Sequence, residues 1–456
     1  MGVPLESAKN GSFHLDAEDG TELPQGKRVP AIFPYMAGCL CVMLSSGGLI
    51  LGLGPFGSRL VKDGYIIDQS DAGVIFTGGF QIMTWGSLVA THMASRVGPR
   101  WCSVMGALLA LVGHVIIATA PMPCDRVVLM IAYGFIGWGG NHIYFSSFQF
   151  ACLFPENVAM ADGLLAGCFT FCGFFLLALN INAISIKVFF TTWVFVVLAV
   201  LVMILVFYPD QPYSLGDPAR LRVPSIKGAQ NPFDLSEYWA TKHYITDKRM
   251  RLRFSLFVFV FSWMMCIMSY CDGAVQVVHT EQAVGKAYGD WGFPLISNST
   301  FLFAPLLGRL IDKTGFVLPG LIGITVAQLA LFMLLLPDSI GAAWLNLLFI
   351  NGVSSSAIPM QIGFLHRALD GKAFNVAIAV VLIVQGLVGF LANPVLTPNP
   401  WGDNTVPPIL CLLIPTGLLY AWPLYELYLQ KRADKEECDT LRELKGSGLG
   451  LGPPAK

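Results

Sequence analysis

Charge is scarce in this sequence. Only 12% of its 456 residues are Asp, Glu, Lys or Arg, against the ~25% that is usual in soluble domains. Because 55% of the residues are hydrophobic, the chain cannot build a water-soluble surface, and a large soluble protein is excluded. The net charge of −1 offers neither the basic surface that nucleic acids require nor a polybasic lipid anchor.

Reactive side-chain patterns are missing as well. The eleven cysteines form no Cys-x-x-Cys pair and lie mostly in apolar stretches, where a thiol packs as a small apolar group. No acid and base are paired at a common depth, so we expect no metal, no cofactor and no enzyme. Cys124 and Cys271 are expected on the same side of the membrane, which makes a disulfide between them conceivable.

Long apolar stretches are abundant instead. About 20 apolar residues at 1.5 Å per residue cross a ~30 Å hydrocarbon core, and hydropathy with Gly/Pro punctuation predicts twelve such helices. We therefore expect an all-α membrane protein. The predicted spans are 30–53, 72–93, 101–120, 127–149, 159–181 and 190–208, then 254–278, 291–310, 316–336, 342–366, 373–392 and 406–429.

The spans fall into two similar halves. Those that begin at 127, 159 and 190 recur at 342, 373 and 406, offsets of 214 to 216 residues. Such a repeat predicts two pseudo-symmetric six-helix bundles with a cavity between them, as in carriers that work by alternating access. The expected organisation is a tail (1–29), the first bundle (30–208), a linker (209–253), the second bundle (254–429) and a disordered tail (430–456).

The basic residues predict the orientation in the membrane. If both termini lie on one side, 23 of the 28 Lys and Arg residues fall on that side. The positive-inside rule then places both termini and the linker in the cytoplasm. We expect a multi-pass protein, in the plasma membrane rather than an organelle, and a monomer.

Charged loops follow the second span of each half. Residues 308–315 read Gly-Arg-Leu-Ile-Asp-Lys-Thr-Gly, whereas 95–100 read Ser-Arg-Val-Gly-Pro-Arg, with Ser95 where an acid is expected. We predict that Asp312 lies against the N-terminus of a helix of the opposite half and gates the cytoplasmic side. The alternative is that the basic residues only orient the loop. The gate-loop residues are Arg96, Gly98, Arg100, Gly308, Asp312, Lys313 and Gly315.

These features resemble the major facilitator superfamily, whose Gly-x-x-x-Asp-Lys/Arg-x-Gly pattern residues 308–315 carry in full. Three stretches resemble solute carrier family 43, the L-type neutral amino acid and equilibrative nucleobase carriers with their protist and fungal relatives. They are residues 47–55 followed by 62–65, residues 76–80 leading to 96–100, and residues 137–141 leading to 153–155. The resemblance implies the twelve-helix major facilitator fold and a small-molecule substrate.

A carrier of this kind binds its substrate near the bilayer midplane, so polar residues in mid-span are candidates. All but the histidine are uncharged, which suits a zwitterion or a neutral polar ring. The alternative for each is hydrogen bonding between helices. The candidates are Ser45, Ser46, Gln81, Thr84, Asn141, His142, Thr170, Tyr270, Asn298, Thr300, Asn351, Ser354, Ser355 and Gln385.

Coupling to protons depends on titratable groups within the spans. Asp272 stands toward the outer end of the seventh span as a possible outer gate or proton site, and we expect no acid at the midplane. His142 is either a proton switch or a neutral side chain bonded to a neighbouring helix. His366 and Arg367 are expected in a short basic loop without a role.

The sequence thus predicts facilitative, uncoupled transport of neutral, large amino acids. Alternatives are a nucleobase or other small organic solute, proton coupling, or a nutrient receptor that does not transport.

Overall fold

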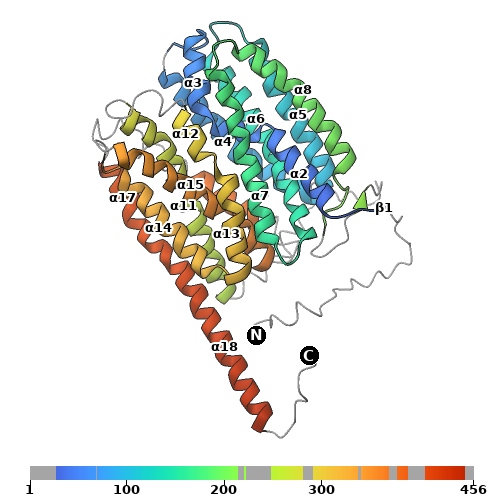
Figure 1. The fold of residues 1–456 in the computed structure, drawn as a ribbon, viewed down its shortest axis with the longest axis vertical. Helices are drawn as coiled ribbons and strands as arrows, with labels where there is room; N and C mark the ends of the chain where they lie inside the picture. Colours follow the sequence, from blue (N-terminus) through green and yellow to red (C-terminus); the bar gives the residue numbers. More distant parts are fainter. Residues whose placement is uncertain are drawn as a thin grey trace.

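The computed structural model describes residues 27–67, 69–213, 220–221, 248–280, 291–336, 340–368, 377–388 and 406–446. Within these ranges the chain is helical, apart from a short antiparallel pair of β1 (Lys27–Arg28) with β2 (Arg220–Leu221). Figure 1 shows the first half of the chain, blue to green, beside the second half, yellow to red.

The first half forms six spans in the described chain, three of them bent or extended by a 3-10 segment. Their elements are α2 (Ile32–Leu44), η1 (Gly47–Leu51), α3 (Leu53–Lys62), α4 (Gln69–Arg96), α5 (Gly98–Thr119), α6 (Arg126–Ser147), η2 (Phe148–Leu153), α7 (Val158–Phe171), η3 (Cys172–Asn180) and α8 (Ile186–Phe207).

The second half supplies the other six spans. Their elements are α11 (Lys248–Thr280), α12 (Phe293–Ser297), α13 (Thr300–Thr314), α14 (Val317–Met333), α15 (Ile340–Ala368), an unlabelled helix at Ala377–Val388, α17 (Val406–Thr416), η5 (Gly417–Tyr420) and α18 (Ala421–Gly446). The all-α fold of twelve spans in two halves is confirmed.

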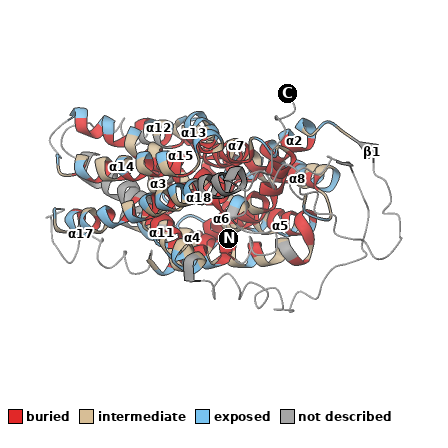
Figure 2. Ribbon diagram, turned by 90° about the horizontal axis from the view of Figure 1, so that it is seen from below, coloured by how far each residue is buried: buried red, intermediate tan, exposed pale blue. Residues whose placement is uncertain are grey.

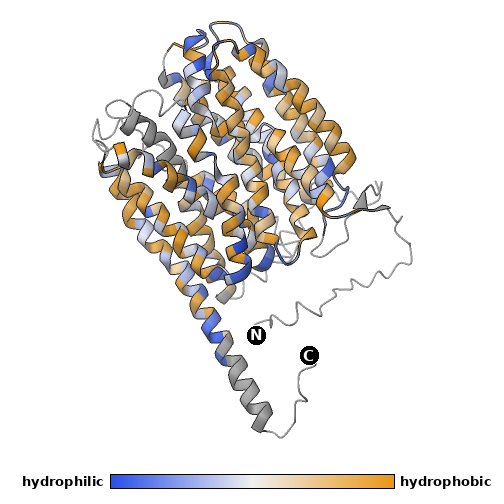
Figure 3. Cartoon of the chain, in the orientation of Figure 1, coloured by the Kyte–Doolittle hydropathy of each residue, from blue (hydrophilic) through white to orange (hydrophobic). Residues whose placement is uncertain are grey.

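Apolar side chains cover the outside of the bundle. Seven of the described helices are long and apolar enough to cross a membrane unaided, and Phe195, Val202 and Leu306 are among the large apolar side chains that are exposed. Figure 3 shows hydrophobic residues along most of each helix, and Figure 2 shows buried residues on the faces where helices meet. Such a surface is matched to lipid rather than to water.

The first span is broken, contrary to the prediction of one helix over 30–53. α2 ends at Leu44, Ser46 has a φ of 75°, and α3 carries the chain on to Lys62. The chain packs closely beside the break: a Cβ on Gly48 would lie 1.7 Å from the Phe169 carbonyl oxygen. Glycine is therefore required at position 48.

The predicted disorder after Gln430 is wrong as far as Gly446. α18 continues to that residue and projects beyond the bundle in Figure 1. Residues 431–445 contain neither Gly nor Pro and are rich in Lys, Arg, Glu and Leu, all of which have high helix propensity.

The two halves meet along α7 and α13, which small residues bring close together. A Cβ on Gly163 would lie 2.5 Å from the Ala304 carbonyl oxygen, and one on Gly308 would lie 2.1 Å from that of Ala159. Helix 377–388 makes a second crossing, with α4. Small residues at helix crossings allow backbone contact in membranes, so these crossings fix how the halves fit together.

One end of the bundle holds the ion-pair contacts of Arg100, Asp162 and Asp312. α8 ends there at Phe207 and α11 begins there at Lys248, so we call it the linker end. It is the side that the positive-inside rule assigns to the cytoplasm.

Candidate functional site

A cavity of about 110 Å³ lies between the halves. Its lining residues in the first half belong to η1, α4, α6, η2 and α7. Those in the second half belong to α11, the turn before α13, α15 and helix 377–388. None of the described residues that line it is charged. Its walls are Leu51, Phe80, Met83, Thr84, Ser87, Asn141, Tyr144, Phe145, Phe148, Phe169 and Thr170 from the first half, with Met265, Asn298, Ser354, Ile358, Gln361, Ile362, Leu382 and Gln385 from the second.

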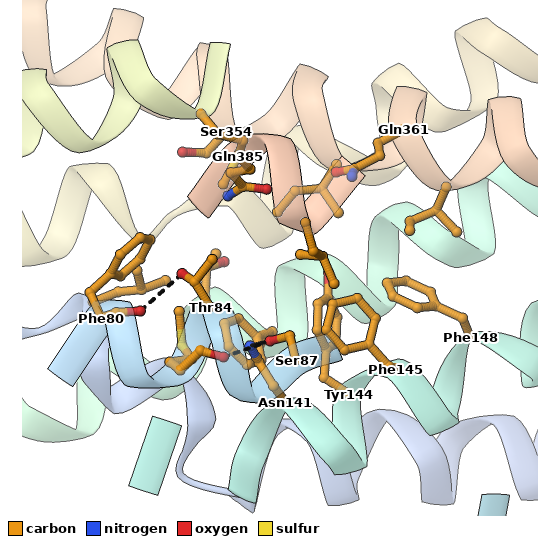
Figure 4. Close-up of a pocket in the computed structure, with 18 of the residues that line it drawn as sticks. Phe80, Thr84, Ser87, Asn141, Tyr144, Phe145, Phe148, Ser354, Gln361 and Gln385 are labelled. Carbon is orange, nitrogen blue, oxygen red and sulfur yellow. Dashed lines mark hydrogen bonds between the residues drawn. The ribbon is translucent and has the colours of Figure 1, made fainter. Parts of the chain in front are cut away.

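Five aromatic residues contribute to the first-half wall, and its polar side chains hydrogen-bond within that half. Asn141 Nδ2 donates to Ser87 Oγ at 2.7 Å, and Ser87 Oγ donates to the Met83 carbonyl at 2.7 Å. Thr84 and Thr170 donate to carbonyls of their own helices. The aromatic rings of Tyr144, Phe145 and Phe148 stand beside these groups in Figure 4. This wall therefore offers a substrate mainly apolar contact.

The second-half wall carries three side-chain amides, one of which has unused hydrogen-bonding capacity. Asn298, Gln361 and Gln385 line the cavity from this half, and within the described chain the buried Nδ2 of Asn298 has no hydrogen-bond partner. Figure 4 shows Gln361, Gln385 and Ser354 on the side opposite the rings. An unpaired buried amide costs free energy, so Asn298 is the cavity residue most in need of a polar ligand.

Six of the residues picked out by mid-span polarity line the cavity: Thr84, Asn141, Thr170, Asn298, Ser354 and Gln385. Seven others are placed elsewhere in the described chain, namely Ser45, Ser46, Gln81, His142, Thr300, Asn351 and Ser355. Tyr270 and Asp272 lie in α11, and Cys271 lies between them, but their side chains are outside the described residues.

Packing inside each half explains the residues that miss the cavity. Ser45 Oγ donates to the Val42 carbonyl at 2.8 Å and thereby helps to end α2. His142 is buried between helices, with Nδ1 3.0 Å from the Trp138 carbonyl. Asn351 is buried against α12 and α13. A polar residue in mid-span can satisfy itself locally, which hydropathy alone cannot reveal.

Several cavity residues were missed, although helical spacing could have found them. Tyr144, Phe145 and Phe148 follow Asn141 by three, four and seven residues, and Gln361 follows Ser354 by seven. Residues at these spacings share a helix face. One correctly placed polar residue therefore identifies its cavity-facing neighbours.

At the linker end, Asp312 bridges the two halves. Its carboxylate accepts hydrogen bonds from the first-turn amides of α7, Ala159 N at 3.2 Å and Met160 N at 2.9 Å. The Asn157 side chain makes no capping bond there. Asp312 thus caps a helix of the opposite half, where orphan amides and the helix dipole favour an anion. Arg367 Nη2 pairs with the same carboxylate at 2.6 Å.

A second contact between the halves joins Asp162 of α7 to His366 of α15. His366 Nδ1 lies 3.0 Å from Asp162 Oδ2, and the Asp162 side chain is fully buried. The prediction that His366 and Arg367 lie in a short loop is wrong, because both lie in the last turn of α15, where each contacts an acid. Asp162 lies within the predicted span 159–181, so Asp272 is not the sole acid within the predicted spans.

The first charged loop acts within its own half. Arg100 pairs with Asp210 at 2.9 Å, and its Nε donates to the Tyr208 carbonyl at 2.7 Å. Gly98 has a φ of 83°, and a Cβ there would lie 1.9 Å from the Asp210 carbonyl oxygen, so glycine is required. Arg96 is buried nearby in the same half. Through Arg100, this loop fastens the end of α8.

The remaining loop residues lie in the second half of α13 or directly after it. Gly315 ends α13 with a φ of 76°, Gly308 packs on Ala159, and Lys313 is exposed. In the described part of the chain no three His, Cys, Asp or Glu residues are grouped as metal ligands.

Comparison with known proteins agrees with this architecture. The family model described as Major Facilitator Superfamily matches residues 29–393. No curated protein matches the sequence. Among solved structures, the E. coli fucose:proton symporter FucP has a TM-score of 0.60 and 12% identity over 87% of this chain and 98% of its own.

Two further structures have the same fold. A POT family transporter in complex with a thioalcohol-conjugated peptide has a TM-score of 0.59 and 14% identity, over 88% of this chain and 96% of its own. The proton:xylose symporter XylE has a TM-score of 0.59 and 13% identity, over 87% and 95%. At these identities the likeness concerns the fold alone. Since the family model covers most of the sequence, the chain is an integral membrane transporter that belongs to the major facilitator superfamily.

Proposed function

We propose that this transporter is a facilitative carrier of large neutral amino acids. The observation that carries the proposal is the division of the cavity into a wall with five aromatic residues from the first half and a wall with three amides from the second, of which Asn298 Nδ2 is buried without a partner. An amino acid of this class has a polar head and an apolar side chain. Its head is matched to Asn298, Gln361 and Gln385, and its side chain to the rings opposite.

The size and charge of the cavity support a small solute without net charge. A volume of about 110 Å³ is below the ~300–1,000 Å³ of pockets for drug-sized ligands. The described lining residues are all uncharged, so they supply no countercharge for a net anion or cation. Since none of these described lining residues has a carboxylate that could carry a proton, we propose uncoupled transport.

The second candidate substrate is a nucleobase. The rings of Tyr144 and Phe169 stack at 4.5 Å with an interplanar angle of 26°, and a planar base can extend such a stack. The amides opposite match the donors and acceptors on the edge of a base. A zwitterion should therefore depend most on the amides of the second half, whereas a base should depend most on the aromatic rings of the first half.

Uptake into vesicles separates these possibilities. Purified protein in liposomes is supplied with labelled leucine, phenylalanine, uracil and adenine, with and without an inward proton gradient. We expect saturable leucine and phenylalanine uptake that the gradient leaves unchanged and that Asp272→Asn preserves. Uptake of uracil or adenine alone would favour the second candidate, and accumulation driven by the gradient would exclude the uncoupled mechanism.

We also propose that the linker end is the cytoplasmic gate. Asp312 with the first turn of α7, and Asp162 with His366, are contacts between the halves that must break when that end opens. Opening exposes the carboxylates and the amides to water, which can replace their hydrogen bonds. A plasma-membrane location, cytoplasmic termini and a monomeric state complete the proposal.

A further inference from the structure

We propose that Asn351 is a positioning residue for substrate binding, which it performs by holding a break in the eighth span. This inference rests on the proposed function, because Asn298, the residue at the break, is one of the three amides assigned to the substrate.

The break lies beside the cavity. α12 ends at Ser297 and α13 begins at Thr300, so Asn298 and Ser299 lie outside regular helix, with φ and ψ of −87° and 0° and of −74° and 16°. Asn298 lines the cavity, is only 2% exposed, and has an unpartnered Nδ2. The side chain at the break therefore reaches the substrate site while its backbone departs from the helix.

The side chain of Asn351, on α15, bonds to both sides of this break. Its Nδ2 donates to the Ile296 carbonyl at 2.6 Å and to Ser299 Oγ. Its Oδ1 accepts from Thr300 Oγ1 at 3.3 Å and from Ser355 Oγ at 2.8 Å. An amide has two donor hydrogens and two acceptor lone pairs, so this side chain is fully used.

The network fixes where Asn298 points. Residues before, within and after the break, Ile296, Ser299 and Thr300, all attach to one buried side chain that is itself 1% exposed. In a low-dielectric interior each bond lost leaves an unpaired group, so the geometry with all four bonds is favoured. Without Asn351 we expect the turn to relax toward regular helix and to rotate Asn298 away from the cavity.

The same helix provides a matched control. Asn346 is also buried on α15, but within the described chain neither atom of its amide has a partner, and it does not line the cavity. Asn346→Ala removes the same side chain from the same helix without touching the break.

The test measures exchange of labelled L-leucine in proteoliposomes for Asn298→Ala, Asn351→Ala, their double variant and Asn346→Ala. Each single variant at 298 or 351 is expected to raise KM by about 3- to 10-fold, as for loss of one hydrogen bond to substrate. The maximal rate should stay within about twofold, and the double variant should be no worse than the poorer single variant. Additive effects on KM, or a fall in maximal rate alone, would contradict the positioning role.

A second readout does not depend on substrate. Asn298→Cys is alkylated with iodoacetamide, and its peptide is followed by mass spectrometry. Alkylation should slow when Asn351→Ala is added and stay unchanged with Asn346→Ala. Equal rates in all three would overturn the inference. If wild-type protein exchanges no leucine, the proposed substrate is wrong, yet the alkylation rates still decide the role of Asn351.

A milder variant covers the case in which Asn351→Ala does not fold. Ser355→Ala removes only the bond to Asn351 Oδ1. It should shift KM and alkylation in the same direction by a smaller factor, and no shift in either would count against the network.

Discussion

Replacing Asp312 by Asn tests whether the contact between its carboxylate and α7 holds the linker end closed. The substitution keeps the size of the side chain but removes its charge, and with it the ion pair to Arg367 and the charge-assisted bonds from Ala159 N and Met160 N. Only the closed arrangement contains these bonds, so their loss should shift the equilibrium toward the open linker end.

The size of the shift follows from the capping geometry. Loss of a helix-capping side chain costs about 0.5 to 2 kcal/mol, and the Asp312 side chain is 3% exposed, so screening by water is small. A change of about 1 to 2 kcal/mol multiplies the ratio of open to closed protein by about 5 to 30. Turnover should fall, because the return to the closed state becomes the slow step.

The assay combines distance and flux. Spin labels on Trp101→Cys and Leu318→Cys, exposed positions at the starts of α5 and α14, report the separation of the halves at the linker end. Asp312→Asn should increase the longer-distance population. Glu156→Gln is the control, because this exposed acid lies just before α7 and loses the same charge without capping it.

An unchanged distance distribution and unchanged maximal exchange, at equal protein content, would refute the reasoning about Asp312. A similar response to Glu156→Gln would also refute it, because the effect would then come from net charge at this end rather than from capping.

Three further predictions follow from the cavity and the crossings. Gln385→Leu should raise KM for leucine about 2- to 10-fold with little change in maximal rate, since it removes one amide from the cavity, and concentration-dependent exchange measures this. Gly308→Leu should lower the maximal rate or the folded yield, because even a Cβ would lie 2.1 Å from the Ala159 carbonyl oxygen; size-exclusion profiles separate the two outcomes. His142→Gln should leave uptake between pH 5.5 and 8 unchanged, because His142 bonds to Trp138 outside the cavity lining, and a flattened pH profile would show instead that it titrates during transport.

Hydropathy and repetition predicted the fold well because both depend on many residues. A span needs only about twenty apolar residues, and a single polar or bent position does not hide it. The break at Ser46 lies beside the close contact of Gly48 with the Phe169 carbonyl, a neighbour 121 residues away in the chain. Such a contact cannot be predicted from the residues that neighbour Gly48 in the sequence.

The site was predicted only in part for a related reason. The rule that substrate-binding residues lie near the bilayer midplane found Asn141, Asn298 and Gln385. The depth of a residue, however, does not fix which face of its helix is directed toward the cavity. Asn351 has the same depth and polarity, yet it bonds to Ile296 and Ser299 behind the cavity. Rotation about the helix axis depends on packing, which a midplane rule ignores.

The linker end shows which contacts between the halves a sequence motif can predict. The acid at Asp312 was found because a repeated pattern marked it, and the prediction that it gates transport stays a prediction. Asp162 and His366 belong to no such pattern and lie 204 residues apart. Their pairing depends on how α7 and α15 come together, which only the assembled bundle shows.

Counterflow tests the central claim most directly. Proteoliposomes loaded with unlabelled leucine are diluted into trace labelled leucine, without any ion gradient. A facilitative carrier with a cavity reached alternately from each side predicts a transient accumulation of label that then decays to equilibrium. Label that only equilibrates, for leucine and for every other neutral amino acid and nucleobase tried, would contradict the account and would point to a receptor that does not transport.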